Sequence, residues 1–280
     1  MSMFLLYLKP MNLKAIRDRR SCRTFDPRPL EPRLLAAVQE LIRSPLKGPF
    51  GGAARFRLVD AGRRGEKRRR LGTYGFVQGA PAFLVGAIAS GEHALEDYGW
   101  CMEKVVLELT RLGLGTCWLG GTFRKSAFAR AAGLAEGEII PAVSPVGLPA
   151  GTKSTIDVLA SAVSGARGRR RGEELFFSSR EEAGVWAAGL DAVREAPSAV
   201  NGQPWRVAID AAAPVLHFFR VSRAQVERRV LQKVDMGIAL CHFELAACEL
   251  GLGGSWRVLG DAPSRPGLVY LASWDGRSGR

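Results

Sequence analysis

The sequence has little of what a metal site or a disulfide framework needs. It holds three histidines and five cysteines, with no CxxC pair and no Cys/His spacing of the zinc-binding kind. We therefore predict no metal site and expect reduced, buried thiols, as in cytoplasmic proteins. A long apolar run is also missing: the one from Met3 to Leu8 stops at Lys9-Pro10, far short of a membrane span. The sequence thus predicts a cytoplasmic protein with no membrane partner.

The net charge of +13 is concentrated in two basic runs, from Arg63 to Arg70 and from Arg167 to Arg171. Such runs can attract nucleic acid or a phosphorylated ligand, or can be a solvated surface. No aromatic residues interleave with them to stack on bases, and no zinc-finger or RNP-type motif is present. We predict that nucleic acid is not a partner.

The chain contains an internal repeat. Residues 97–118 align without a gap to residues 235–256, at an offset of 138, with eight of 22 positions identical. Upstream, Phe56-Arg57-Leu58-Val59 resembles Trp205-Arg206-Val207-Ala208 at an offset of 149. Each copy has the pattern of an amphipathic helix that ends at a Gly-Leu-Gly and runs into a strand holding a tryptophan. The repeat predicts an internal duplication.

The remaining periodicity favours an α+β fold, with helices packed on mixed or mostly antiparallel sheets. No GxGxxG opens a helix after the first strand, which argues against a Rossmann fold. Helices are predicted at 32–44 and 179–195, and strands at 82–88, 142–147, 206–209, 215–221 and 268–274. Residues 154–174 have no clear period and are expected to be the crossing between the halves.

Three segments have a composition suited to ligand binding. Residues 19–23 place three guanidiniums and a hydroxyl just before a turn, where they could hold a phosphate or form an exposed basic turn. Residues 196–205 combine two rigid prolines with Ser, Asn and Gln, which suits hydrogen bonding to a planar heterocycle or a structured turn. Residues 113–122 carry glycines that could let a ligand approach the main chain, or that simply stop a helix.

These three segments resemble the flavin-binding elements of the nitroreductase family. The similarity is strongest to a subgroup with the fold duplicated in one chain, which residues 72–80 and 118–123 also resemble, and it covers residues 12–275. The resemblance implies a nitroreductase-like fold and a single-chain pseudo-dimer, with halves at 12–172 and 173–280. It also implies that the chain binds FMN. The single-chain pseudo-dimer could act as a monomer, and whether it associates further stays open.

The resemblance assigns roles to particular residues. It implies that Arg19, Arg20 and Ser21 hold the phosphate and ribityl side of FMN, and that Arg23 lies near the N1/O2 edge of the ring. A loop against one ring face is expected from Pro197, Ser198, Ala199, Asn201 and Gln203. Main chain near N5 would come from Leu119, Gly120 and Gly121, further phosphate contacts from Arg169 and Arg171, and the substrate pocket from Thr73 or Tyr74.

Each half retains only one of the two family signatures. The first half has the arginine segment, but its counterpart of the Asn/Gln loop has become residues 47–52. The second half has the loop, but its counterpart of the arginine segment has become residues 177–181. We therefore expect one composite FMN site per chain.

The resemblance implies an oxidoreductase that passes reducing equivalents from NAD(P)H, through FMN, to a nitroaromatic, a quinone or a similar small acceptor. The chemistry belongs to the cofactor, so no catalytic acid or base is expected. Two alternatives stay open at this point. One is other flavin chemistry on the same fold, such as dehalogenation or dehydrogenation, and the other is a non-catalytic flavin-binding protein.

Overall fold

The computed structural model describes residues 13–61, 73, 75–152, 168–210, 212–222 and 226–279. The chain forms two compact units. Asp18–Arg167 form the N-terminal unit, and Met1–Arg17 with Gly168–Arg280 form the C-terminal unit. The unit boundaries differ from the predicted halves, because α1 (Leu13–Asp18) groups with the C-terminal residues up to Arg17. Within that unit, the Leu13 amide donates to Glu249 Oε2 over 2.5 Å.

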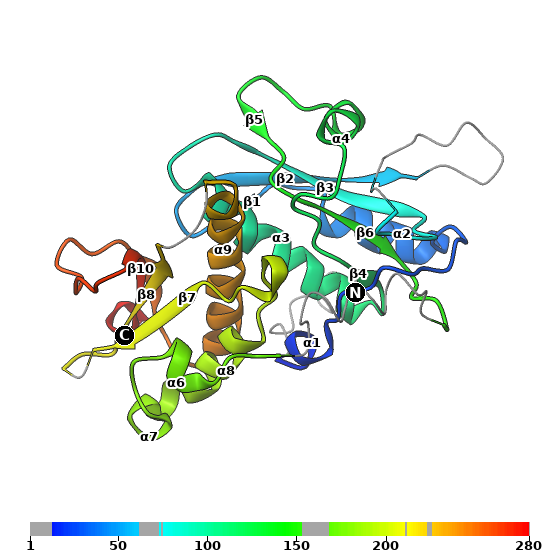
Figure 1. Ribbon diagram of the computed structural model, residues 1–280. Helices are drawn as coiled ribbons and strands as arrows, with labels where there is room; N and C mark the ends of the chain where they lie inside the picture. Colours follow the sequence, from blue (N-terminus) through cyan, green and yellow to red (C-terminus); the bar gives the residue numbers. More distant parts are fainter. Residues whose placement is uncertain are drawn as a thin grey trace. The chain divides into compact units, whose positions relative to one another are not determined.

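The N-terminal unit is built on one antiparallel sheet with the strand order β1-β2-β3-β6-β4, and β5 pairs with β3 (Figure 1). Its strands are β1 (Leu46–Lys47), β2 (Ala53–Asp60), β3 (Ala82–Ala89), β4 (Gly115–Thr116), β5 (Glu138–Ile139) and β6 (Val143–Gly147). Its helices are α2 (Pro32–Leu41), α3 (Ala94–Arg111) and α4 (Lys125–Ala132).

Helix α3 covers one face of this sheet. Tyr98 is fully buried and its hydroxyl donates to the Ala142 carbonyl over 2.5 Å, which ties α3 to the residue before β6. Gly86 on β3 is needed here, because a Cβ at this position would lie 2.5 Å from the Phe56 ring and 2.7 Å from the Tyr98 ring. The close approach of helix to strand thus depends on a missing side chain.

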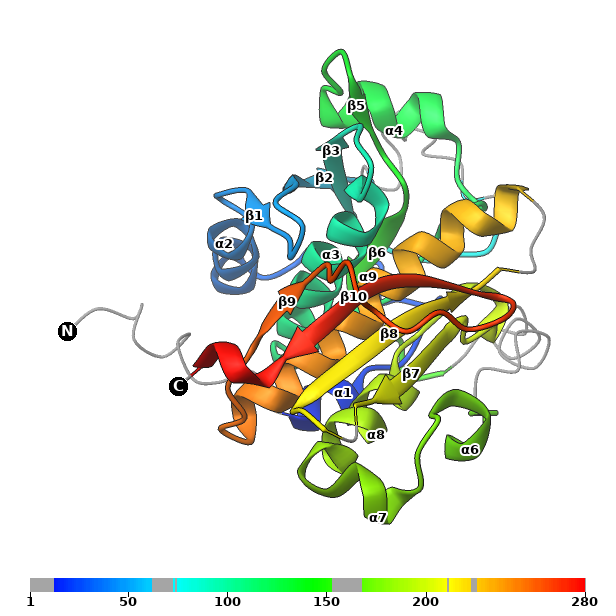
Figure 2. The ribbon, with the colours of Figure 1, turned by 90° about the vertical axis from the view of Figure 1, so that its left-hand side faces the viewer.

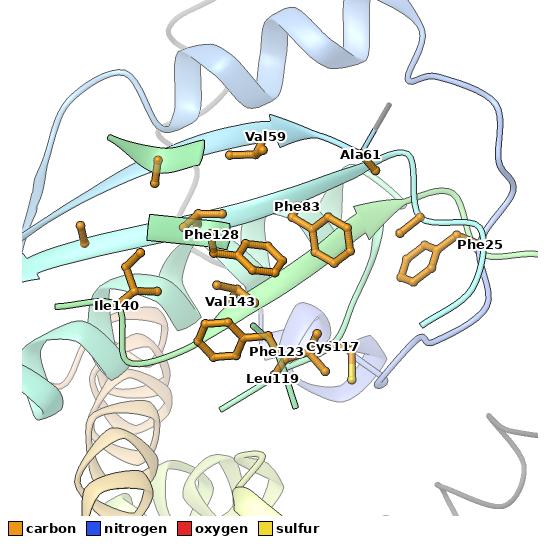
Figure 3. Packing of buried hydrophobic residues seen from close by; sticks show 14 residues of the cluster. Phe25, Val59, Ala61, Phe83, Cys117, Leu119, Phe123, Phe128, Ile140 and Val143 are labelled. Carbon is orange, nitrogen blue, oxygen red and sulfur yellow. The ribbon is translucent and has the colours of Figure 1, made fainter. Parts of the chain in front are cut away.

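The opposite face of the sheet holds an aromatic core. Phe128 of α4 packs edge-on against Phe83 of β3, at a centroid distance of 5.3 Å, and against Phe123, at 5.4 Å. Figure 3 shows these rings gathered over the sheet, with Val143 of β6 and Leu119 in the same cluster. Because Cys117, Leu119 and Phe123 are buried in this cluster, the segment from Cys117 to Phe123 is held against the sheet.

The C-terminal unit has a four-stranded antiparallel sheet in the order β7-β8-β10-β9, with α9 along one face (Figure 2). The strands are β7 (Trp205–Ile209), β8 (Val215–Val221), β9 (Ser255–Arg257) and β10 (Leu268–Asp275). The helices are α6 (Gly172–Leu175), α7 (Arg180–Ala183), α8 (Ala187–Glu195) and α9 (Val226–Glu249), with short 3-10 turns η2 (Gly184–Trp186), η3 (Ala199–Asn201) and η4 (Gly276–Gly279). Phe243 of α9 packs against four rings, those of Trp186, Phe218, Trp256 and Trp274.

These elements confirm the predicted α+β class and most of the predicted strands. Three expectations are corrected. The helix predicted over 179–195 is interrupted at Gly184, whose φ of 50° and ψ of −122° are not helical. Trp118 lies outside any strand, because β4 ends at Thr116. Cys248 is exposed, although the thiols were expected to be buried. The basic run at 63–70 and most of the expected crossing lie outside the described residues.

Candidate functional site

The arginine segment runs through the N-terminal unit as an extended strip. Ser21 forms a parallel bridge with Thr116, and the Cys22 amide donates to the Thr116 carbonyl over 2.7 Å. On the other side, the Gln78 amide donates to the Arg23 carbonyl over 2.8 Å. The strip therefore lies between the end of β4 and the loop before β3. Three segments singled out in the sequence, 19–23, 72–80 and 113–122, meet here within one unit.

Two glycines make this arrangement possible. Gly115 lies against Cys22, and a Cβ on the glycine would come within 2.9 Å of the cysteine Cβ and Sγ. Gly79 has a φ of +76°, and a Cβ there would collide with the Phe25 carbonyl oxygen. Glycine takes a positive φ without steric penalty. The strip can therefore lie close enough to β4 and to the loop before β3 for main-chain hydrogen bonds to form on both sides.

The four predicted residues of the strip divide into one buried and three accessible side chains. Arg19 is buried, with its Nε 4.0 Å from Oε1 of the fully buried Glu103. Arg20 is exposed, and its Nη1 donates to the Arg19 carbonyl over 2.8 Å. Ser21 and Arg23 are half-buried. The strip thus presents cationic and hydroxyl groups at the surface while Arg19 is directed toward α3.

The glycine segment after β4 has one fixed and one accessible part. Leu119 exchanges both main-chain hydrogen bonds with Val143, at 2.9 and 3.0 Å, so its amide is committed to the sheet. Gly120 is half-buried and Gly121 is exposed, and a Cβ built on Gly121 meets no atom within 4 Å. Of the three residues predicted to face N5, the two glycines have the more accessible main chain.

The weaker pocket candidates have different outcomes. Thr73 is buried, and its carbonyl accepts from the Phe76 amide over 3.0 Å. Tyr74 lies outside the described residues. The position of Thr73 keeps it in the same loop that carries Gln78.

In the C-terminal unit, the loop over 197–203 has an unusual backbone. Val200, Asn201 and Gln203 have φ values of 48°, 53° and 46°, and among the described residues they are the only non-glycine ones with positive φ. Each such residue costs about 1–3 kcal/mol and persists only where its surroundings fix it. Backbone strain of this kind is concentrated at functional sites.

Several hydrogen bonds hold this loop from within and from below. Ser198 Oγ accepts from the Gln203 amide over 2.9 Å, and the Gly202 amide donates to the Ala199 carbonyl over 3.0 Å. From α9, Asp235 Oδ1 accepts from the Ala199 amide over 3.0 Å. Asp235 is buried, and this burial raises its pKa to about 8. The carboxyl is therefore mostly protonated at neutral pH.

The loop also organises the start of the C-terminal unit. Arg169 Nη1 donates to Asn201 Oδ1 over 3.0 Å, and its Nη2 donates to the Glu195 carbonyl over 2.8 Å. The Arg170 amide donates to Gln203 Oε1 over 2.8 Å. Arg169, predicted as part of a basic pair, is thus brought together with Asn201 and Gln203 of the predicted loop. Arg171 is exposed, and its amide contact is with Glu174 of α6 instead.

A family model described as "Putative TM nitroreductase" matches residues 12–247. The chain belongs to this family. Nitroreductases are oxidoreductases, which gives the coarse class of activity and confirms the nitroreductase-like fold.

A solved structure has the same fold over nearly the whole chain. A crystal structure of a Thermotoga maritima protein, also described as a nitroreductase, shares 22% identity with this nitroreductase-family chain and has a TM-score of 0.62. The match covers 95% of this chain and 94% of that one. A Desulfitobacterium hafniense nitroreductase with bound FMN matches 52% of this chain and 93% of its own, at 25% identity and a TM-score of 0.39. A search of curated proteins found no match.

Two residues of this nitroreductase-family site were missed by the sequence analysis. Asp235 had a usable signal, because it is identical to Asp97 in the repeat and was treated only as part of the alignment. Glu103 had none, since its counterpart in the repeat is Cys241. Its role follows only from the fold, which brings α3 beneath Arg19 and Trp118.

Proposed function

We propose that the chain is an FMN-dependent oxidoreductase that reduces a nitroaromatic, a quinone or a similar small acceptor with electrons from NAD(P)H. The observation that carries the proposal is the bridge between Ser21 and Thr116. It sets the cationic strip alongside the strand whose continuation bears Gly120 and Gly121. Names of relatives support the choice of cofactor, since the Desulfitobacterium hafniense nitroreductase holds FMN.

The groups in the N-terminal unit suit a flavin mononucleotide. Arg20 is exposed, and a guanidinium can hold a phosphate through two parallel charge-assisted hydrogen bonds. Ser21 can add a hydroxyl toward the ribityl chain. Arg23 would stabilise negative charge on the ring. Arg19 contributes differently, because its burial against Glu103 makes it an anchor for the strip.

The proposal assigns the ring face to the loop of the C-terminal unit. Pro197, Ser198 and Asn201 are half-buried, so the loop offers surface as well as structure. Arg169 holds the Asn201 side chain, and we propose that this is its main contribution to FMN binding. Because each predicted half keeps one signature, one FMN per chain follows, with the chain derived by internal duplication.

Bound FMN would supply hydride and electron transfer, as it does in flavoenzymes generally. This chain's own residues bind the cofactor, orient the ring and leave room for donor and acceptor. Other flavin reactions on the same scaffold would use the same residues, so acceptor profiling separates them. A cytoplasmic location stays a prediction.

The first test is the purified protein itself. We expect a yellow protein with one FMN per chain, bleached anaerobically by NADH or NADPH and reoxidised by a nitroaromatic or a quinone. A colourless protein that takes up no added FMN would contradict the proposal. A protein that binds FMN but is never bleached would support the non-catalytic alternative.

The second test asks whether both units serve one cofactor. Arg23→Ala in one unit and Asn201→Ala in the other should each weaken FMN binding by about tenfold, roughly the loss of one charge-assisted or buried hydrogen bond. Arg28→Ala is a suitable control, since Arg28 is exposed and pairs with the neighbouring Asp26. Unchanged affinity in both site variants would refute the assignment.

A further inference from the structure

The two units hold corresponding loops through corresponding aspartates. In the N-terminal unit, Asp97 of α3 accepts from the Phe50 amide at Oδ1 over 2.8 Å. In the C-terminal unit, Asp235 of α9 accepts from the Ala199 amide at Oδ1 over 3.0 Å. The offset from Asp97 to Asp235 is 138, and that from Phe50 to Ala199 is 149. These are the two offsets of the sequence repeat, so the same hydrogen bond is made at the same repeat positions.

The two loops differ in backbone strain, because their positive φ angles fall on glycine in one loop and on other residues in the second. In the N-terminal unit the loop contains Gly48, Gly51 and Gly52, and Gly51 takes its φ of +96° at little cost. Asp97 fits closely among these glycines, and its Oδ2 also accepts from the Gly52 amide over 2.6 Å. In the C-terminal unit the strained positions are Val200, Asn201 and Gln203, none of which is glycine. A strained loop needs an external constraint, and a relaxed one does not.

From this contrast we propose that Asp235 is a positioning residue for FMN. By fixing Ala199 at the start of the turn, it holds the left-handed conformation that presents Pro197, Ser198 and Asn201. Asp235 itself lies beneath the loop and is buried, so it acts through the loop and not by contact with cofactor. The inference rests on the proposed function and adds a residue to it.

Burial of the carboxyl supports this role. Asp235 is 5% exposed, and burial raises its pKa to about 8. A mostly neutral carboxyl resembles a carboxamide, whose oxygen can accept the same hydrogen bond from Ala199. Asparagine should therefore replace Asp235 in holding the loop, whereas alanine should not.

The experiment measures FMN dissociation constants by flavin fluorescence, well below the unfolding temperature of each variant. We expect Asp235→Ala to weaken FMN binding by about tenfold, roughly the loss of one buried hydrogen bond. Asp235→Asn should stay within about threefold of the wild type, which is the rescue that separates positioning from charge. Asp97→Ala is the matched control: it removes the corresponding side chain from the relaxed loop and should leave FMN affinity within about threefold.

Each outcome decides the matter. Wild-type affinity in Asp235→Ala would overturn the positioning role while leaving the proposed function intact. Equal losses in Asp235→Ala and Asp97→Ala would also overturn it, since they would reflect general destabilisation. A wild-type protein that binds no FMN would overturn the proposed function and this inference together. If Asp235→Ala does not fold, Asp235→Ser takes its place with the same expectations, because its hydroxyl is too short to reach Ala199.

Discussion

The indole Nε1 of Trp118 donates a hydrogen bond to Oε2 of Glu103 over 2.7 Å, while Oε1 of the same carboxylate lies 4.0 Å from Arg19 Nε. One buried side chain of α3 thus contacts both the cationic strip and the segment that leads to Gly120. Carboxylates are rarely buried to this extent without such partners. We regard Glu103 as the residue that sets the spacing between the two segments.

Removing the charge of Glu103 should destabilise the N-terminal unit. Glu103→Gln retains an acceptor for Trp118 but leaves the Arg19 guanidinium without this carboxylate, and breaking a buried pair costs about 3–5 kcal/mol. We expect a loss of about 3 kcal/mol in the free energy of unfolding, measured by urea denaturation. Glu108→Gln is the control on the same helix, because its pair with Arg111 is a near-surface i,i+3 contact worth only about 0.5 kcal/mol. Equal effects of the two substitutions would contradict this account.

Gly79→Ala should disturb the strip by steric conflict. The new Cβ would collide with the Phe25 carbonyl oxygen, in addition to the cost of about 1–2 kcal/mol for a left-handed residue. Gly75→Ala isolates the second cost, since its φ is +82° and no atom lies within 4 Å of its Cβ. Thermal unfolding should show a clearly larger loss for Gly79→Ala, accompanied by weaker FMN binding. Similar unfolding temperatures for Gly79→Ala and Gly75→Ala would mean that the strip moves to accommodate the new Cβ without loss of stability.

The pair between Arg55 and Glu138 should make stability depend on acidic pH. Arg55 Nε donates to Glu138 Oε1 over 2.8 Å, and this hydrogen bond is the main cause that lowers the pKa of Glu138. A lowered carboxylate pKa contributes stability that is present above the ordinary glutamate pKa and is lost as pH falls through the lowered value. The contribution of this partly buried pair is about 1 kcal/mol. Urea denaturation between pH 7 and 3 should show it in the wild type, and Arg55→Ala should lack it.

Asp235 should give the opposite dependence. Since burial raises its pKa to about 8, the folded protein binds a proton that the unfolded chain releases at lower pH. The free energy of unfolding should therefore fall as pH rises between the ordinary aspartate pKa and about 8. Asp235→Asn should flatten this slope, although Asp97, whose pKa burial also raises, will leave a residual one. A slope unchanged in Asp235→Asn would show that the carboxyl does not titrate in this range.

Most helices and strands could be predicted because the spacing of apolar residues and the turn signals lie within each element. The strands β8 and β10 follow from runs of apolar residues between turn signals, and they were expected at 215–221 and 268–274. The break at Gly184 was missed because the helical spacing of apolar residues continues across it, although the Gly184 backbone is not helical.

The site was predictable in its residues but not in their environment. Asn201 and Gln203 were predicted from one loop and Arg169 from a basic pair elsewhere, and the structure joins them through hydrogen bonds. Burial of Arg19 could not be predicted, because its partner Glu103 lies 84 residues away in a helix. The left-handed backbone at Val200 is likewise hidden, since valine carries no local preference for it.

The grouping of residues 13–17 with the C-terminal unit means that the polypeptide passes from one unit to the other twice, at Arg17–Asp18 and at Arg167–Gly168. A single proteolytic cut in the second connection would leave α1 on the N-terminal fragment. Glu249, which accepts the hydrogen bond from the Leu13 amide, would then be on the C-terminal fragment. Recombining separately expressed fragments would therefore mean re-docking that helix.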